Sequence, residues 1–77
     1  MRKYRNPRQS LYHWLLTVKP GECIEFIAQD FGLNKNTLEV YLRDISREHF
    51  GYRLGIRSTG PDSMGVRRLA DAEVAYG

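Results

Sequence analysis

Residues 27–45, IAQDFGLNKNTLEVYLRDI, place two helical patterns back to back with only a short turn between them. Gly32 stands where the first pattern ends. Glycine is common there because the residue after a helix often adopts a positive φ. Asn34 stands where a following helix needs its N-cap. This stretch therefore predicts two helices that meet at Gly32 and cross steeply.

Apolar residues recur at helical spacing on both sides of that turn. The second helix is predicted to bury a face made of Ile24, Ile27, Ala28 and Phe31. The third is predicted to bury Leu38, Tyr41, Leu42 and Ile45 and to end at Gly51. A very short strand over residues 22–24 is compatible with the sequence that leads into the second helix.

A first helix is predicted upstream of this pair. Asn6 suits the N-cap position, and Pro7 suits the first helical position. The apolar stripe that follows has i, i+3, i+4, i+7 spacing and consists of Leu11, Trp14, Leu15 and Val18. Pro20 cannot donate a helical hydrogen bond, so we expect the helix to end near Val18 or Lys19.

Beyond Gly51 the period of the apolar residues changes from about 3.6 to 2. Tyr52, Leu54 and Ile56 alternate with polar or small residues, as in a half-buried strand. The segment 58–65, STGPDSMG, is rich in turn-forming residues. A second strand over residues 66–69 completes a predicted β-hairpin, residues 52–69, with an exposed polar tip.

The chain of 77 residues predicts a single domain with a small core. We expect a basic N-terminal arm over residues 1–7, a folded domain over residues 8–69 and a flexible C-terminal tail over residues 70–77. No apolar run approaches the roughly 20 residues that span a bilayer, and no signal-peptide core follows the N-terminus, so we expect a cytoplasmic protein.

The sequence offers little material for catalysis or cofactor binding. Cys23 is the only cysteine and is predicted to be buried and inert, and with two distant histidines it forms no metal-binding motif. The chain also has no phosphate-binding glycine-rich loop and no catalytic spacing of Ser, His and acidic residues. We therefore expect neither enzymatic activity nor a cofactor.

Positive charge is concentrated in two separate segments. The chain has a net charge of +3, whereas residues 1–10 alone carry four basic side chains. Residues 50–69 carry four arginines against one acid, Asp62. This asymmetry predicts one positive face directed at a polyanion.

The residues around the predicted turn carry a family resemblance, namely Ala28, Gly32, Thr37, Leu38, Leu42 and Ile45. Their pattern resembles the helix-turn-helix of bacterial and phage transcription regulators. With the hairpin added, residues 8–69 are similar to the winged helix-turn-helix family. The resemblance implies a mainly α fold of three helices with a β-hairpin wing, which binds DNA through the third helix and the wing.

The resemblance makes the third helix a recognition helix. Its outward residues have side chains suited to base edges or a thymine methyl group, namely Lys35, Asn36, Glu39, Val40 and Arg43. Asn34 and Thr37, at the helix N-terminus, are placed to hold a phosphate. The wing is expected to contact phosphates or the minor groove through Arg53, Arg57, Arg67 and Arg68. The arm is expected to grasp DNA with Arg2, Lys3, Arg5 and Arg8.

The predicted function is sequence-preferring binding of double-stranded DNA, as a transcriptional regulator or a phage or mobile-element accessory factor. The third helix balances its basic residues with Glu39, Asp44 and Glu48, which is also compatible with an ordinary solvated face. The alternative is a protein-binding adaptor or inhibitor of a host protein, and an RNA-binding wing is a third reading. A homodimer or cooperative array is possible, with candidate contacts at Leu11, Tyr12, Leu15, Val74 and Tyr76.

Overall fold

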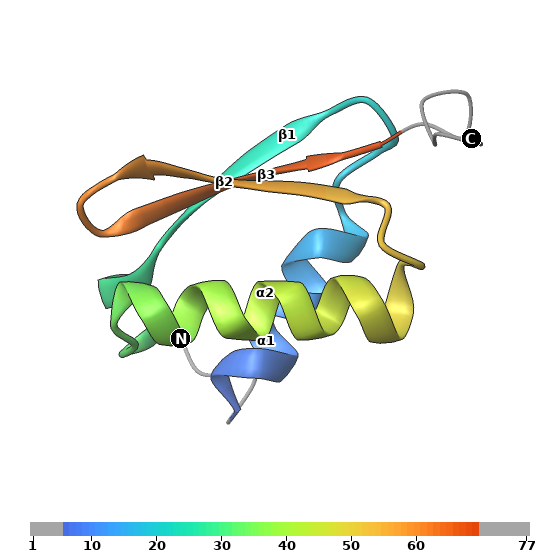
Figure 1. Ribbon diagram of the computed structural model, residues 1–77. Helices are drawn as coiled ribbons and strands as arrows, with labels where there is room; N and C mark the ends of the chain where they lie inside the picture. The colour runs from blue at the N-terminus through green and yellow to red at the C-terminus, as the bar shows by residue number, and fades with distance from the viewer. Residues whose placement is uncertain (1–5, 70–77) are drawn as a thin grey trace.

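The computed structural model describes residues 6–69, which form two helices and a three-stranded antiparallel sheet (Figure 1). The elements in chain order are α1 (Pro7–Leu16), β1 (Cys23–Ile27), the 3₁₀ helix η1 (Ala28–Phe31), α2 (Lys35–His49), β2 (Leu54–Gly60) and β3 (Ser63–Arg68). The strand order is β1-β3-β2, so β1 and β2 are the two edges. Both helices cover the same face of the sheet, which gives two layers (Figure 1). The predicted arm residues Arg2, Lys3 and Arg5 and the predicted tail, residues 70–77, lie outside the described residues.

The predicted three-helix winged helix-turn-helix is wrong, because the second helix is not formed. Its predicted residues are divided between the strand β1 and the single turn η1. In β1, Phe26 is buried and Ile24 packs against the core, whereas Cys23 and Glu25 are exposed. This alternation has the period of a strand, and β-branched and aromatic residues favour that conformation. β1 pairs with β3 from Cys23↔Arg67 to Ile27↔Ser63.

The turn before α2 and the N-caps of both helices are as predicted, whereas α1 ends at Leu16, before the predicted end near Val18 or Lys19. Gly32 has a φ of 68° and a ψ of 26°, the left-handed conformation that favours glycine. The side chain of Asn34 accepts a hydrogen bond from the backbone N–H of Thr37 at 2.8 Å. At α1, Asn6 Oδ1 accepts from the N–H of Arg8 at 2.9 Å, and Pro7 begins the helix.

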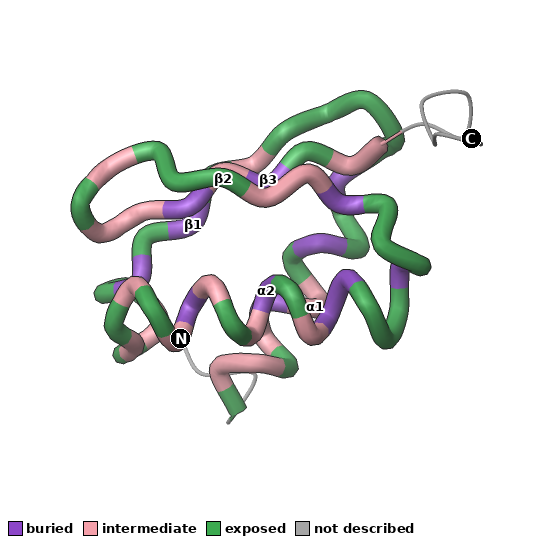
Figure 2. The backbone as a smooth tube through the Cα atoms, in the orientation of Figure 1, coloured by how far each residue is buried: buried purple, intermediate pink, exposed green. Residues whose placement is uncertain are grey.

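The core fills the space between the helices and the sheet (Figure 2). Its most completely buried members are Leu11, Leu15, Leu38, Leu42, Ile45, Met64 and Val66. Leu11 and Leu15, two of the candidate dimer contacts, are buried in this core. The prediction that Trp14 belongs to the core is also wrong, since it is 51% exposed.

The hairpin has longer strands and a shorter turn than predicted. Its strands run to Gly60 and from Ser63, so Pro61 and Asp62 alone separate them. The register shifts between Ser58 and Gly60, which marks a β-bulge beside the tip. At the other end, Gly51 and Tyr52 both have positive φ and reverse the chain after α2. β2 therefore runs back above α2, and the hairpin tip returns to the start of the helix (Figure 1).

Candidate nucleic-acid interface

The exposed side of α2 is a continuous stripe of four residues, Asn36, Val40, Arg43 and Arg47. Their spacing of i, i+4, i+7 and i+11 keeps them on one helical face. Val40 is 53% exposed despite its apolar side chain. The buried residues of the helix, Leu38, Leu42 and Ile45, lie on the other side. We call these four exposed residues the α2 stripe.

Three of the predicted base-contacting residues, Asn36, Val40 and Arg43, thus lie together on the α2 stripe. Arg47 was missed as a contact residue, because its position in the last turn suggested a role at the negative end of the helix. Arg47 follows Arg43 by four residues, a helical spacing that places both on one face of α2. This spacing could have identified Arg47 as a contact residue from the sequence.

Each arginine of the α2 stripe lies beside a carboxylate. Arg43 binds Glu39, with Nη2 and Nε at 2.7 and 2.9 Å from Oε2. Arg47 Nη2 lies 3.4 Å from Asp44 and 3.5 Å from Glu48. These exposed ion pairs add little stability, but they lower the positive potential over the helix.

A second layer of ion pairs joins α2 to α1. Arg8 Nη2 lies 2.8 Å from Glu48 and 3.9 Å from Asp44. Desolvation raises the pKa of the Glu48 carboxyl, but the hydrogen bonds and charges of Arg8 and Arg47 outweigh it, so the pKa lies below its ordinary value. Arg8, predicted to belong to a DNA-grasping arm, is thus paired to the carboxylates of α2.

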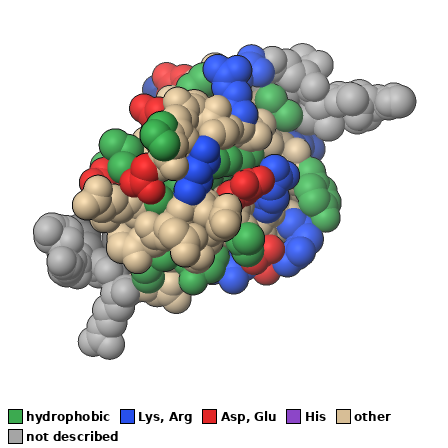
Figure 3. All heavy atoms as spheres, turned by 60° about the vertical axis from the view of Figure 1, so that its left-hand side comes forward, with side chains coloured by type: hydrophobic (Ala, Val, Ile, Leu, Met, Phe, Trp, Pro, Cys, Tyr) green, Lys and Arg blue, Asp and Glu red, His purple; other side chains and the backbone are tan. Residues whose placement is uncertain are grey.

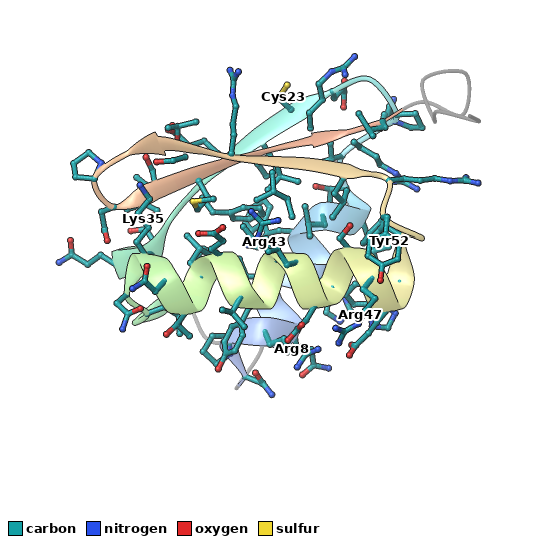
Figure 4. The ribbon with its side chains drawn as sticks, viewed as in Figure 1. Arg8, Cys23, Lys35, Arg43, Arg47 and Tyr52 are labelled. Carbon is teal, nitrogen blue, oxygen red and sulfur yellow. The ribbon has the colours of Figure 1, made fainter. Side chains whose placement is uncertain are left out.

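Two other residues that were predicted to contact DNA instead form hydrogen bonds within the protein. Lys35 Nζ donates to Ser58 Oγ and to the carbonyl oxygen of Gly60, the latter at 2.6 Å, and so fastens the start of α2 to the hairpin (Figure 4). Arg68 Nη1 donates to the carbonyl oxygen of Val18 at 2.9 Å, and its guanidinium carbon lies 5.2 Å from the centre of the Phe50 ring. Both side chains point into the protein rather than towards a ligand.

Arg57 and Arg67 lie elsewhere, on the face of the sheet that points away from both helices. The register places Arg57 opposite Gly65 and Arg67 opposite Gly55. Cys23, paired with Arg67, projects from the same face (Figure 4) and is exposed, contrary to the predicted burial. We call the alternating residues of this side the outer sheet face: Cys23, Glu25, Ile27, Gly55, Arg57, Thr59, Ser63, Gly65 and Arg67.

The predicted single positive face is therefore absent from the described part of the chain. The arginines of α2 and those of the sheet belong to different layers. Over the side of the molecule that Figure 3 presents, Lys and Arg side chains are interspersed with Asp and Glu. The α2 stripe and the outer sheet face are therefore two separate surfaces of the protein.

Arg53 lies at a third place, the C-terminal end of α2. It shares an open cavity of about 370 Å³ with Arg68, and the other lining residues are Pro20, His49, Phe50, Gly51 and Leu69. The ring of His49 also packs on Tyr12, with ring centres 4.3 Å apart. The C-terminal end of α2 and the hairpin tip lie at opposite ends of the molecule (Figure 1).

Within residues 6–69, no three His, Cys, Asp or Glu side chains gather as metal ligands do. Neither α1 nor α2 has the combination of length and apolar composition needed to cross a membrane. No protein-family model, no curated protein and no solved structure matches this chain, so the candidate interface rests on the geometry of its own residues.

Proposed function

We propose that this chain binds double-stranded DNA by placing the α2 stripe in the major groove. The observation that carries the proposal is the unbroken exposure of Asn36, Val40, Arg43 and Arg47 along a helix of 15 residues. An α-helix fits the major groove, where each base pair presents a distinct pattern of donors and acceptors. None of the four side chains belongs to the core.

The side chains of the stripe supply complementary readout chemistry. Arg43 can donate two hydrogen bonds to guanine O6 and N7, and Asn36 can pair with adenine N6 and N7. Val40 can contact a thymine methyl group. Arg47, one turn further along, is placed for a phosphate. Glu39 orients the Arg43 guanidinium in the free protein and can accept from cytosine N4.

The paired carboxylates imply weak electrostatic attraction. With Lys35 and Arg68 tied to the fold, we expect about two to four phosphate contacts, and hence a log-log salt slope of roughly −2 to −4. Affinity would then depend on base contacts more than on charge. A protein of this kind acts by occupancy, as a transcriptional regulator or a phage or mobile-element accessory factor.

The sharpest test uses the two partners of one ion pair. Glu39→Gln removes a negative charge at the groove and frees Arg43, so affinity for a duplex selected from a random pool should rise about threefold to tenfold. Arg43→Ala should lower it about tenfold to a hundredfold, by 1 to 3 kcal/mol. Fluorescence anisotropy at two salt concentrations measures both. Equal affinities for both variants and the unmodified chain would refute the proposal.

A protein-binding adaptor is the second candidate, and the ion pairs favour it. A surface on which Arg43 and Arg47 are already matched by acids suits a protein partner of mixed charge better than a polyanion. The edge strand β2, beside α2, also offers backbone groups for an added strand. In this case Glu39 takes part in the contact, so Glu39→Gln should weaken binding to the protein partner. Neither the unmodified chain nor this variant should then bind DNA.

A further inference from the structure

The strand β1 lies at one edge of the sheet, and one of its two sides is open. It pairs with β3 alone, from Cys23↔Arg67 to Ile27↔Ser63 (Figure 1). An edge strand presents backbone N–H and C=O groups that no neighbouring strand uses, and an extended chain can pair with them. We call the open side of this strand the β1 edge.

The hydrogen bonds at the two ends of β1 determine which backbone groups point to the β1 edge. The N–H of Arg68 donates to the carbonyl oxygen of Glu22, and the N–H of Ala28 donates to that of Asp62. In an antiparallel pair, residues that exchange hydrogen bonds alternate with residues that do not. The residues of β1 that share the phase of Glu22 and Ala28 therefore bond to β3. The backbone N–H groups of the other residues point to the β1 edge, namely those of Cys23, Glu25 and Ile27.

These outward groups have no hydrogen-bond partner within residues 6–69. No backbone bond to another described residue is made by the N–H groups of Cys23, Glu25 and Ile27, or by the carbonyl oxygens of Cys23 and Glu25. All three residues are exposed. Backbone groups in such a position bond to water, which an added strand can replace. The β1 edge is therefore open to a strand from outside.

The other edge strand, β2, is shielded near the hairpin tip. Its register shifts between Ser58 and Gly60, and Lys35 Nζ donates to the hydroxyl of the first and the carbonyl oxygen of the second. Bulges and covering groups are devices that keep an edge from pairing. The register of β1 has no such shift. Of the two edges, β1 is thus the better template for a regular ladder.

The β1 edge is acidic. Residues 21–33, which include β1, carry Glu22, Glu25 and Asp30 and no basic residue. The side chain of Glu25 lies on the outer sheet face, with Arg67 of β3 as its diagonal neighbour. A second copy of β1 would bring a second set of these acids to the edge, whereas a basic strand would offset their charge. Charge complementarity therefore favours a basic partner over a second copy.

An apolar residue follows this acid on the same face. Ile27 is 43% exposed and shares the outer sheet face with Glu25. Side chains directly opposite each other on paired strands are in contact. A basic side chain can therefore lie opposite Glu25, and an apolar one, two positions along the partner, can lie opposite Ile27. A β-branched residue suits the apolar position because it favours an extended chain.

We propose that β1 binds an extended basic peptide segment of another protein, which adds a further strand to the three-stranded sheet. The backbone groups of Cys23, Glu25 and Ile27 supply the hydrogen bonds, and the Glu25 carboxylate selects lysine or arginine. Binding at this edge does not depend on the proposed function. The α2 stripe lies in the other layer of the fold, so a strand added to β1 leaves it uncovered (Figure 1).

Defined peptides test the backbone contact. The probe is a capped octapeptide of alternating lysine and valine, and NMR follows hydrogen exchange in the full chain. On binding, the amide protons of Cys23, Glu25 and Ile27 should exchange about tenfold more slowly. Those of Ile24 and Phe26, already bonded to β3, should change little. Methyl groups on one alternate set of peptide nitrogens should abolish binding because they face β1, whereas on the other set they point away and should not.

Substitutions at Glu25 test the chemistry of the partner. Glu25→Gln should lower the affinity for the lysine–valine peptide about twofold to fivefold. Glu25→Lys should make the chain prefer a peptide of alternating glutamate and valine. Glu48→Gln is the matched control, because it removes an exposed acid from α2, and it should leave the affinity unchanged. NMR titration measures all three variants.

Other occupants of the β1 edge would give different results. Slow exchange of the amide protons of Cys23 and Glu25 in the chain alone would mean that the edge is already covered. Slowing that increases with chain concentration indicates a second copy, and slowing that does not indicates a segment of the same chain. Either result overturns the proposal, as do equal effects of the two methylated peptides or a peptide preference that Glu25→Lys leaves unchanged. Failure of DNA binding would overturn the proposed function alone.

Discussion

The α2 stripe and the outer sheet face each present two arginines, but these arginines have different kinds of neighbour. Arg43 and Arg47 have carboxylates within 4 Å, supplied by residues one to four positions away on the same helix. In the register of the sheet, Arg57 lies opposite Gly65, and Arg67 lies between Gly55 on one neighbouring strand and Cys23 on the other. Helical spacing brings nearby residues of the sequence into contact, whereas a sheet joins residues from distant segments. The neighbours of a charged side chain therefore depend on the element that carries it, and a count of charges along the sequence does not reveal them.

The largest effect that distinguishes the two surfaces should be on sequence preference. Asn36→Ala removes a side chain able to pair with adenine, so discrimination at one base pair should fall by about 1 to 3 kcal/mol. Arg57→Ala, on the sheet, should leave the preferred sequence unchanged. Selection from a random duplex pool followed by sequencing measures both. If the two variants alter the selected sequence alike, the division of labour between the surfaces is wrong.

A smaller effect, on the free energy of unfolding, should distinguish Lys35, which is bonded to the hairpin, from Arg43, which lies on the exposed α2 stripe. Lys35→Met removes two hydrogen bonds to the hairpin and leaves the carbonyl oxygen of Gly60 without this donor, so the free energy of unfolding should fall by about 1 to 2 kcal/mol. Arg43→Met removes an exposed ion pair of the α2 stripe and should cost less than about 0.5 kcal/mol. Urea unfolding compares them, and equal losses would contradict the assigned roles.

The smallest expected effect is on the pKa of Glu48, one of the carboxylates that offset the positive charges of α2. Arg8→Ala removes the strongest partner of Glu48, so the pKa of Glu48 should rise towards its ordinary value. Because the folded pKa is lowered, its stabilising contribution is present above the ordinary pKa and is lost as the pH falls through the folded pKa. Carbon-detected NMR titration of the Glu48 carboxyl measures the change. An unchanged pKa would show that Arg8 does not hold this acid in solution.

Local rules predicted the starts of both helices and much of the core. Asn6, Gly32 and Asn34 act over a few residues, and each occupies the predicted position. The α2 stripe was also predictable, because it lies opposite the apolar residues of its own helix. Leu38 and Leu42 fix which side faces the solvent.

The conformation of residues 24–31 could not be predicted from local patterns, because it depends on pairing between distant strands. The segment from Ile24 to Phe31 fits a helical pattern through Ile27 and Ala28, yet it also fits a strand through Ile24 and Phe26. Pairing of β1 with β3, about forty residues later in the chain, selects the strand. The pairing of β3 with both β1 and β2 places Arg57 and Arg67 on the face that points away from α2. No local pattern reveals that Lys35 reaches Gly60 rather than a ligand.

The reversal at Gly51 and Tyr52 couples the lengths of two elements. The 15 residues of α2 span about 22 Å, and the seven residues of β2 span about 23 Å, so the strand brings the chain back level with the first residue of the helix. One additional helical turn would carry Lys35 about 5.4 Å beyond the tip it fastens. Insertions in α2 should therefore be tolerated only with a matching extension of the hairpin, whereas substitutions at the four exposed positions leave this match of lengths unchanged.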